Sequence, residues 1–161
     1  MKLPETRNYM AQPNELHDKL FVSLGCRIQK AVALMYYQKE SPYASLITHH
    51  KYRYCIEIGR TLAMRYARTL MKVGFFKDID VVLPMPMFVI KEMWKGFNHA
   101  KIIAEGVCEV SGIPLGDNLK MVRPRPPQKH LGADARYANV SHLFAVSHPE
   151  ELDGLHILIV D

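Results

Sequence analysis

A strand followed by cationic and amide groups is the first place where this chain can do chemistry. The run IDVVLP, residues 79–84, predicts a buried strand that ends at a proline. From there PMPMFVIKEMWKGFNHA brings Lys91, Lys95, Gly96 and Asn98 together in sequence. Two lysines, a glycine and the exposed amides of a helix start can cradle a phosphate or pyrophosphate. The alternative is a structural loop with solvated lysines, which the spacing by itself favours.

Two later stretches also carry polar groups next to predicted strands. The segment RPRPPQKHLGADARYANV, residues 123–140, is rich in cations and proline and poor in apolar residues; its cations are Arg123, Arg125, Lys129, His130 and Arg136. It predicts either a mobile basic flap over an anionic ligand or a surface loop, and the pattern does not decide between them. The last stretch, HILIVD, predicts a buried strand that ends on Asp161, a carboxylate suited to hydroxyl groups or metal-bound oxygens.

Helices and strands must position these groups. Apolar spacing predicts helices over residues 16–38 and 56–73, the second ending at Gly74, and a short helix after Ser41-Pro42. Asn98 can cap a further helix that Gly112 ends. Further strands are predicted at residues 119–122, 143–146 and 156–160. Strands that alternate with helices predict an α/β fold with a parallel sheet, whose carboxyl edge is where ligands bind.

Composition limits the class of protein. The chain has 161 residues, 48% hydrophobic and 23% charged, as in an ordinary globular domain. No apolar run is long enough for a membrane span and the start lacks a signal peptide, so we expect no membrane insertion and a cytoplasmic location. Three distant cysteines favour buried thiols over a disulfide framework or a zinc ribbon. Lys and Arg exceed Asp and Glu by 21 to 16, which favours an anionic ligand.

Taken together and in order, these stretches resemble the ComF family of phosphoribosyltransferase-like proteins. The resemblance covers roughly residues 30–161 and rests on an ordered set of motifs. Its members are HKYRYCIEIG (50–59), VLPMP (82–86), KGFNHA (95–100), Gln128, Arg136, Asn139-Val140, Phe144 and ILIVD (157–161).

The resemblance implies a type I phosphoribosyltransferase fold, whose parallel sheet binds 5-phosphoribosyl 1-pyrophosphate with Mg²⁺ at its carboxyl edge. Residues 84–98 would be the pyrophosphate-side loop and residues 128–139 a flexible hood. By this comparison Asp161 and Arg136 are the catalytic candidates, and the ligand-binding candidates are Pro84, Pro86, Lys95, Gly96, Asn98, Gln128 and Asn139. It divides the chain into a helical leader region, residues 1–50, and a partial phosphoribosyltransferase-like domain, residues 51–161. We expect no protein-built metal site.

The chain departs from the family pattern in several places. A second Asp and a Thr-Thr-Gly loop usually follow the position of Asp161, whereas this sequence stops at that residue. Phe88-Val89-Ile90 and Met93-Trp94 stand where arginines are common, and His99 replaces a Gln. The Cys-rich N-terminal zinc module is missing. We therefore expect either a truncated form or fragment of a longer protein, incomplete at its C-terminus, or a remnant that has lost the reaction. In both cases we expect no transferase turnover and an uncovered apolar surface that favours self-association.

A nucleic-acid-binding protein is the alternative from another class. The net charge is +5, HHKYRYC at residues 49–55 interleaves cations with tyrosines, and the resembling family is associated with DNA uptake in competence. This hypothesis predicts salt-dependent binding of single-stranded DNA without transferase activity. A solvated helix face explains the same charges.

Overall fold

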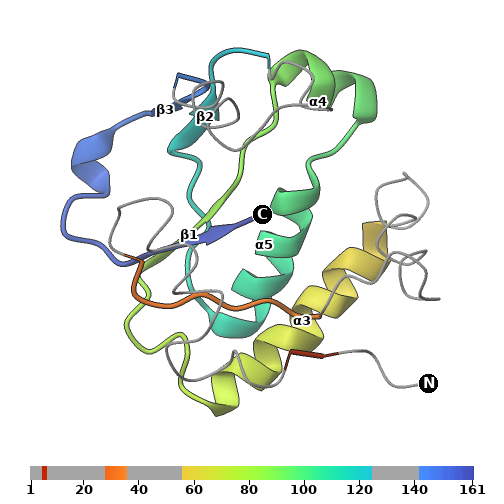
Figure 1. Ribbon diagram of the computed structural model, residues 1–161, viewed down its shortest axis with the longest axis vertical. Coiled ribbons are helices and arrows are strands. Elements are labelled where there is room, and N and C mark those ends of the chain that lie inside the picture. Colours follow the sequence, from red (N-terminus) through yellow and green to blue (C-terminus); the bar gives the residue numbers. More distant parts are fainter. Residues whose placement is uncertain (1–4, 7–27, 36–55, 125–141) are drawn as a thin grey trace, which may run out of the picture.

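The computed structural model (Figure 1) describes residues 5–6, 28–35, 56–124 and 142–161, which form an α/β arrangement with a small parallel sheet. Most of the predicted leader region, residues 1–50, lies outside these ranges. Along the chain the elements are α3 (Ile56–Lys72), β1 (Val81–Pro84), α4 (Val89–Lys95), α5 (His99–Ser111), β2 (Leu119–Met121), β3 (Phe144–Val146), the 3₁₀ turn η3 (Pro149–Glu151) and β4 (Ile157–Val160).

Helix α3 confirms the predicted helix over residues 56–73, and Gly74 follows it with φ 69°. Its buried residues are small or branched and recur on one face: Gly59, Ala63, Ala67 and Leu70. This face packs on α5 so closely that a Cβ added at Gly106 would lie 2.9 Å from the Arg60 carbonyl oxygen. Arg60 also crosses to Glu109 on α5, with 2.6 Å between Nη2 and Oε2.

Helix α5 begins and ends where the sequence predicts. Asn98 is its N-cap and accepts a hydrogen bond from the Ala100 N–H at 3.0 Å. At the other end Gly112 has φ 75° and donates its N–H to the Cys108 carbonyl at 2.8 Å. Both ends are fixed by local chemistry, so α5 holds a defined position behind the sheet.

The parallel sheet is built on β1. β4 pairs with it in parallel, Val81 opposite Ile157 and Pro84 opposite Val160. On the other side of β1, Val82 bridges in parallel to Leu115. Val82 thus has a neighbour on each side, and none of its surface is exposed. The sheet is central to the fold even though its paired strands are short.

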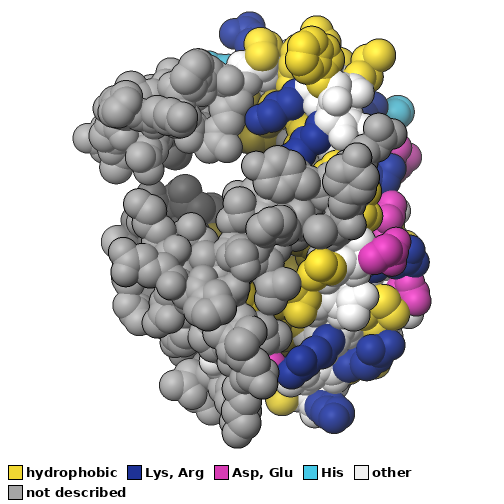
Figure 2. Space-filling view, turned by 90° about the vertical axis from the view of Figure 1, so that its right-hand side faces the viewer, with side chains coloured by type: hydrophobic (Ala, Val, Ile, Leu, Met, Phe, Trp, Pro, Cys, Tyr) yellow, Lys and Arg dark blue, Asp and Glu magenta, His cyan; other side chains and the backbone are white. Residues whose placement is uncertain are grey.

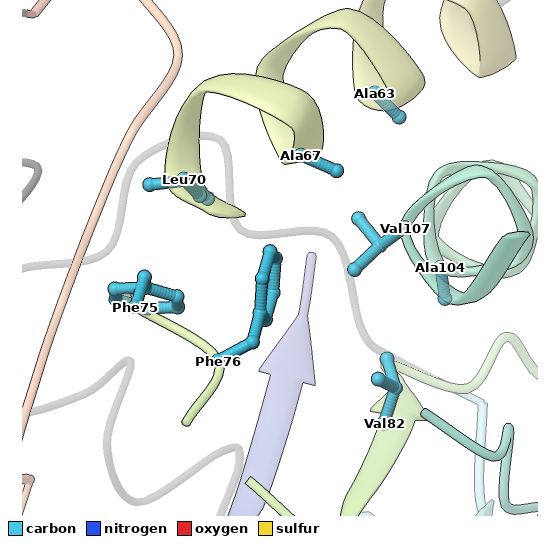
Figure 3. Packing of buried hydrophobic residues seen from close by; sticks show 8 residues of the cluster. All are labelled: Ala63, Ala67, Leu70, Phe75, Phe76, Val82, Ala104 and Val107. Carbon is cyan, nitrogen blue, oxygen red and sulfur yellow. The ribbon is translucent and has the colours of Figure 1, made fainter. Parts of the chain in front are cut away.

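One face of the sheet closes the core. Val82 packs with residues of α3 and α5 and with two phenylalanines from the connection between α3 and β1, in a cluster of eight buried side chains: Ala63, Ala67, Leu70, Phe75, Phe76, Val82, Ala104 and Val107 (Figure 3). Phe75 and Phe76 meet edge to face, with 5.3 Å between ring centroids. Leu158 and Val160 of β4 pack against this cluster, so alternate residues of β4 serve the core.

The prediction that the strands form one parallel sheet is wrong for β2 and β3. These two pair antiparallel, Leu119 opposite Val146 and Met121 opposite Phe144. Val122 directly follows β2, and its N–H donates to the carbonyl of Leu143, which directly precedes β3, at 2.8 Å. The chain therefore enters β3 at the end where it left β2. A return at the same end requires antiparallel pairing.

The predicted helix over residues 16–38 is wrong where the structure describes it, at residues 28–35. This segment is not helical, and Met35 forms a bridge with Glu5. Its carbonyl groups accept hydrogen bonds from other segments: the Tyr66 hydroxyl donates to Ala33 at 2.9 Å, and the Thr6 N–H donates to Leu34 at 3.2 Å. Tertiary hydrogen bonds here replace those of a helix.

Candidate functional site

The carboxyl ends of β1 and β4 lie at one edge of the sheet. The register sets Pro84 opposite Val160, and the Met85 N–H donates to the Val160 carbonyl at 2.8 Å. Asp161 follows directly and is exposed. It therefore lies beside the Met85–Pro86 exit of β1, in an edge position typical of ligand sites in parallel α/β sheets.

The register that places Asp161 is also held at the opposite end of the strands. The Asp80 N–H donates to the His156 carbonyl at 2.9 Å, and the His156 N–H donates to the Asp80 carboxylate at 2.8 Å. A slip by one residue would break this pair of bonds and turn the core residues of β4 outward. Asp80 is thus a positioning residue for the far end of the strand.

Asn98 joins the start of α5 to the same edge. Its Nδ2 donates to the Met85 carbonyl at 2.9 Å while its Oδ1 accepts from the Ala100 N–H. The side chain is buried, with 7% of its surface exposed. These bonds bring the turn at residues 95–98 next to the exit of β1, and hence to the edge that carries Asp161. Asn98 serves the architecture of this edge, and its contact with a ligand remains a prediction.

A cation and an imidazole lie together at this turn. Lys95 Nζ contacts His99 Nε2 and also lies 5.5 Å from the centroid of the Phe97 ring. The rings of Phe97 and His99 meet edge to face at 4.8 Å. Gly96 has φ 80°, the left-handed conformation that allows the chain to turn from α4 toward α5. The buried Phe97 ring thus anchors two basic groups near the sheet edge.

The predicted loop between Pro84 and Asn98 contains a helix that the sequence reasoning missed. Helix α4 occupies Val89–Lys95, and Gly96 closes it by donating its N–H to the Glu92 carbonyl at 2.7 Å. None of its residues is buried. The signal was present as apolar pairs spaced four residues apart, Val89 with Met93 and Ile90 with Trp94. Pro84 and Pro86 lie at the exit of β1, before this helix.

Three further candidates, Gln128, Arg136 and Asn139, lie outside the described residues. The strands that flank their segment are described and are tied together by Asn118, which is buried. Asn118 donates to the Ser147 carbonyl at 3.2 Å and to the Glu151 carboxylate at 2.8 Å. These bonds close the end of the β2–β3 pair that lies away from residues 123–142. The other end of the pair is closed by the Val122 N–H, which donates to the Leu143 carbonyl at 2.8 Å.

Burial shifts the titration of two groups on the helices behind the sheet. It raises the pKa of the Tyr66 hydroxyl, opposed by a hydrogen bond with Thr6, and it raises the pKa of the Cys108 thiol. A raised thiol pKa suits a packing role for Cys108 rather than a nucleophilic one.

No cluster of three or more metal-ligating side chains occurs in residues 5–6, 28–35, 56–124 and 142–161. None of the helices in these ranges has the length and apolar character needed to span a bilayer. Comparison of the chain with protein-family models, with curated proteins and with solved structures found no match.

Proposed function

We propose that this chain is a phosphoribosyltransferase-like protein of the ComF kind, with a type I phosphoribosyltransferase fold. In this proposal it binds 5-phosphoribosyl 1-pyrophosphate, or a nucleotide-like ligand, at the carboxyl edge of β1 and β4. One observation carries the proposal: the parallel register of β1 and β4 brings Asp161 beside Met85, and Met85 is hydrogen-bonded to Asn98. Two distant motifs of the resemblance thus share one edge, where such folds bind ligands.

The chemistry of this edge suits a sugar carrying phosphates. A carboxylate at Asp161 accepts hydrogen bonds from ribose hydroxyls. Lys95 and the N-terminal amides of α5 offer positive charge and donors for a pyrophosphate. The two kinds of group are separated by the exit of β1, so opposite ends of one ligand can meet opposite charges.

Magnesium fits this edge as a companion of the ligand. Mg²⁺ is commonly bound through one or two carboxylates together with substrate phosphates, and Asp161 offers a carboxylate at this edge. Bound magnesium would neutralise part of the pyrophosphate charge. Asp161 would hold and orient that complex against the sheet edge.

Calorimetric titration of the full chain with 5-phosphoribosyl 1-pyrophosphate, with and without Mg²⁺, tests the proposal. We expect magnesium-dependent binding that Asp161→Asn weakens by roughly tenfold or more, since a charged hydrogen bond is lost. Asp153→Asn is the matched control, because Asp153 is an exposed acid away from this edge. Equal affinity in the two variants, or no binding by the wild type, would refute the site. Pyrophosphate release in the same samples measures turnover separately.

Nucleic-acid binding is a second candidate, supported by an exposed cationic stripe on α3. Arg65, Arg68 and Lys72 fall on one helix face and are exposed. Lys and Arg side chains also gather at the lower end of the surface in Figure 2. Binding of single-stranded DNA that weakens with salt, and weakens further in Arg68→Gln/Lys72→Gln, would favour this candidate. DNA binding that is unchanged in that variant would count against it.

A further inference from the structure

Helix α4 presents its apolar side to solvent. At about 100° per residue its apolar side chains occupy one continuous arc of about 140°, formed by Val89, Met93, Ile90 and Trp94. They are 60%, 77%, 59% and 92% exposed, in that order. In Figure 2 hydrophobic side chains gather at the top of the molecule, with Lys and Arg side chains beside them. An amphipathic helix normally turns its apolar side to a core, so the outward arc of α4 marks a contact surface.

Strand β4 carries the second apolar surface that is left uncovered. Leu158 and Val160 face the core, while Ile157 and Ile159, on the opposite face, are 39% and 59% exposed. Among the strands that the structure describes, β4 pairs with β1 alone, so β4 is an edge strand there. Its own α4 lies beyond the N-terminal end of α5, past the tip of β4 (Figure 1). The open face of β4 is therefore not covered by α4 of the same chain.

The two surfaces complement each other in shape and charge. On the same face of the sheet Val81 and Leu83 of β1 are buried, so the uncovered apolar surface is the strip that Ile157 and Ile159 form on β4. A short convex helix with an exposed Trp is suited to pack on such a strip. Lys91 is exposed beside the arc of α4. The exposed acid Asp161 follows β4, and Asp80, whose carboxylate accepts from the His156 N–H at 2.8 Å, lies at the other end of the strand. Opposite charges around an apolar contact orient the partners and raise their rate of association.

We infer that the occupant of each surface is a second copy of this chain, with α4 of one copy packed on the open face of β4 of the other. The contact joins two different surfaces, so it is heterologous. Each copy carries both the apolar arc of α4 and the outer face of β4. Two copies can therefore make both contacts with each other and close into a dimer, or successive copies can add to an open chain. The inference shares Asp161 with the proposed ligand site, but its test changes only residues of α4 and of the outer face of β4.

Trp94 is the chain's single tryptophan, and its emission therefore reports on the arc of α4 directly. We expect emission to shift to shorter wavelength as the protein concentration rises, in step with an increase in sedimentation coefficient. Met93→Glu on α4 and Ile159→Lys on β4 should each weaken association by roughly tenfold or more, because each places a charge in an apolar contact. Met71→Glu is the matched control, since Met71 is an apolar residue, 47% exposed, on α3.

Mixing the two variants gives the decisive result. Met93→Glu retains an intact β4 face and Ile159→Lys retains an intact α4, so an equimolar mixture should form heterodimers through one restored contact. A chain that stays monomeric at all concentrations would overturn the inference. So would association lost in only one of the two variants, which indicates a contact between identical surfaces. A blue shift of Trp94 caused by anionic phospholipid vesicles, without self-association, would assign the arc of α4 to a membrane surface instead.

Discussion

Replacing Asn98 by Ala removes the side chain that connects β1 to α5. The variant loses the bond from Nδ2 to the Met85 carbonyl and the bond from the Ala100 N–H to Oδ1, 2.9 and 3.0 Å long in the structure. Both belong to a side chain that is only 7% exposed, so water replaces them poorly. The expected loss is therefore larger than that of an exposed helix cap.

The magnitude follows from the two bonds. Loss of an N-cap costs about 1 kcal/mol. Loss of the second bond leaves the half-buried Met85 carbonyl without its Asn98 donor, which costs about 1–3 kcal/mol. Asn98→Ala should thus lower the free energy of unfolding by about 2–4 kcal/mol, a large part of the stability of an ordinary domain.

A series of substitutions separates the two contributions. Asn98→Ser keeps an N-cap oxygen but cannot reach Met85 with an amide, so we expect it to be about 1 kcal/mol more stable than Asn98→Ala and still less stable than the wild type. Urea unfolding followed by far-UV circular dichroism measures the three proteins under identical conditions. The reasoning is refuted if Asn98→Ser matches the wild type, or if Asn98→Ala costs less than about 0.5 kcal/mol.

Three other perturbations test the helices behind the sheet. Gly106→Ala should lower the urea midpoint, because the added methyl group is crowded against the Arg60 carbonyl at a cost of about 1–3 kcal/mol. This cost outweighs the roughly 1 kcal/mol that Ala gains over Gly in helix propensity. An unchanged midpoint would contradict the close packing of α3 on α5. The raised pKa of Tyr66 means that the folded chain holds the hydroxyl proton more tightly than the unfolded chain, in which the Tyr pKa is near 10.0. The protonated hydroxyl therefore contributes its full stabilisation below pH 10.0, and this contribution is lost as the pH rises further. Tyr66→Phe should accordingly show a smaller alkaline loss of stability than the wild type, and equal losses would rule out this role. Cys108 should be alkylated more slowly at neutral pH than a peptide thiol, as measured by mass spectrometry, and a faster reaction would contradict its raised pKa.

Sequence signals predicted the structure correctly where residues close in sequence make the hydrogen bonds of the backbone groups. Helix α5 is the clearest case, because Asn98 and Gly112 fix its two ends by bonds within a few residues. The apolar spacing of α3 predicted its extent but not its deepest residues. Ala63 and Ala67 are buried in place of the larger Leu62 and Tyr66, since close approach of two helices selects small side chains along the contact line.

Periodicity failed where partners distant in sequence replace local bonds. Residues 28–35 carry helical spacing, yet their carbonyls accept donors from Thr6 and Tyr66. In α4 the apolar spacing is real, but a pattern does not say which side faces the core. The antiparallel pairing of β2 and β3 likewise depends on where the chain returns.

The sequence by itself determined the α/β class, the ends of α5, and the positions of the strands that precede Pro84 and Asp161, because these depend on side-chain period and on caps a few residues long. Only the tertiary structure decided that Asp161 and Asn98 share one edge, since their proximity rests on a parallel register between strands more than seventy residues apart in the chain and on one hydrogen bond to Met85. It also decided that the apolar side of α4 faces outward. The spacing of residues along the chain specifies which side chains share one face of a helix or strand. The packing between helices and strands specifies whether that face contacts the core, another element or solvent.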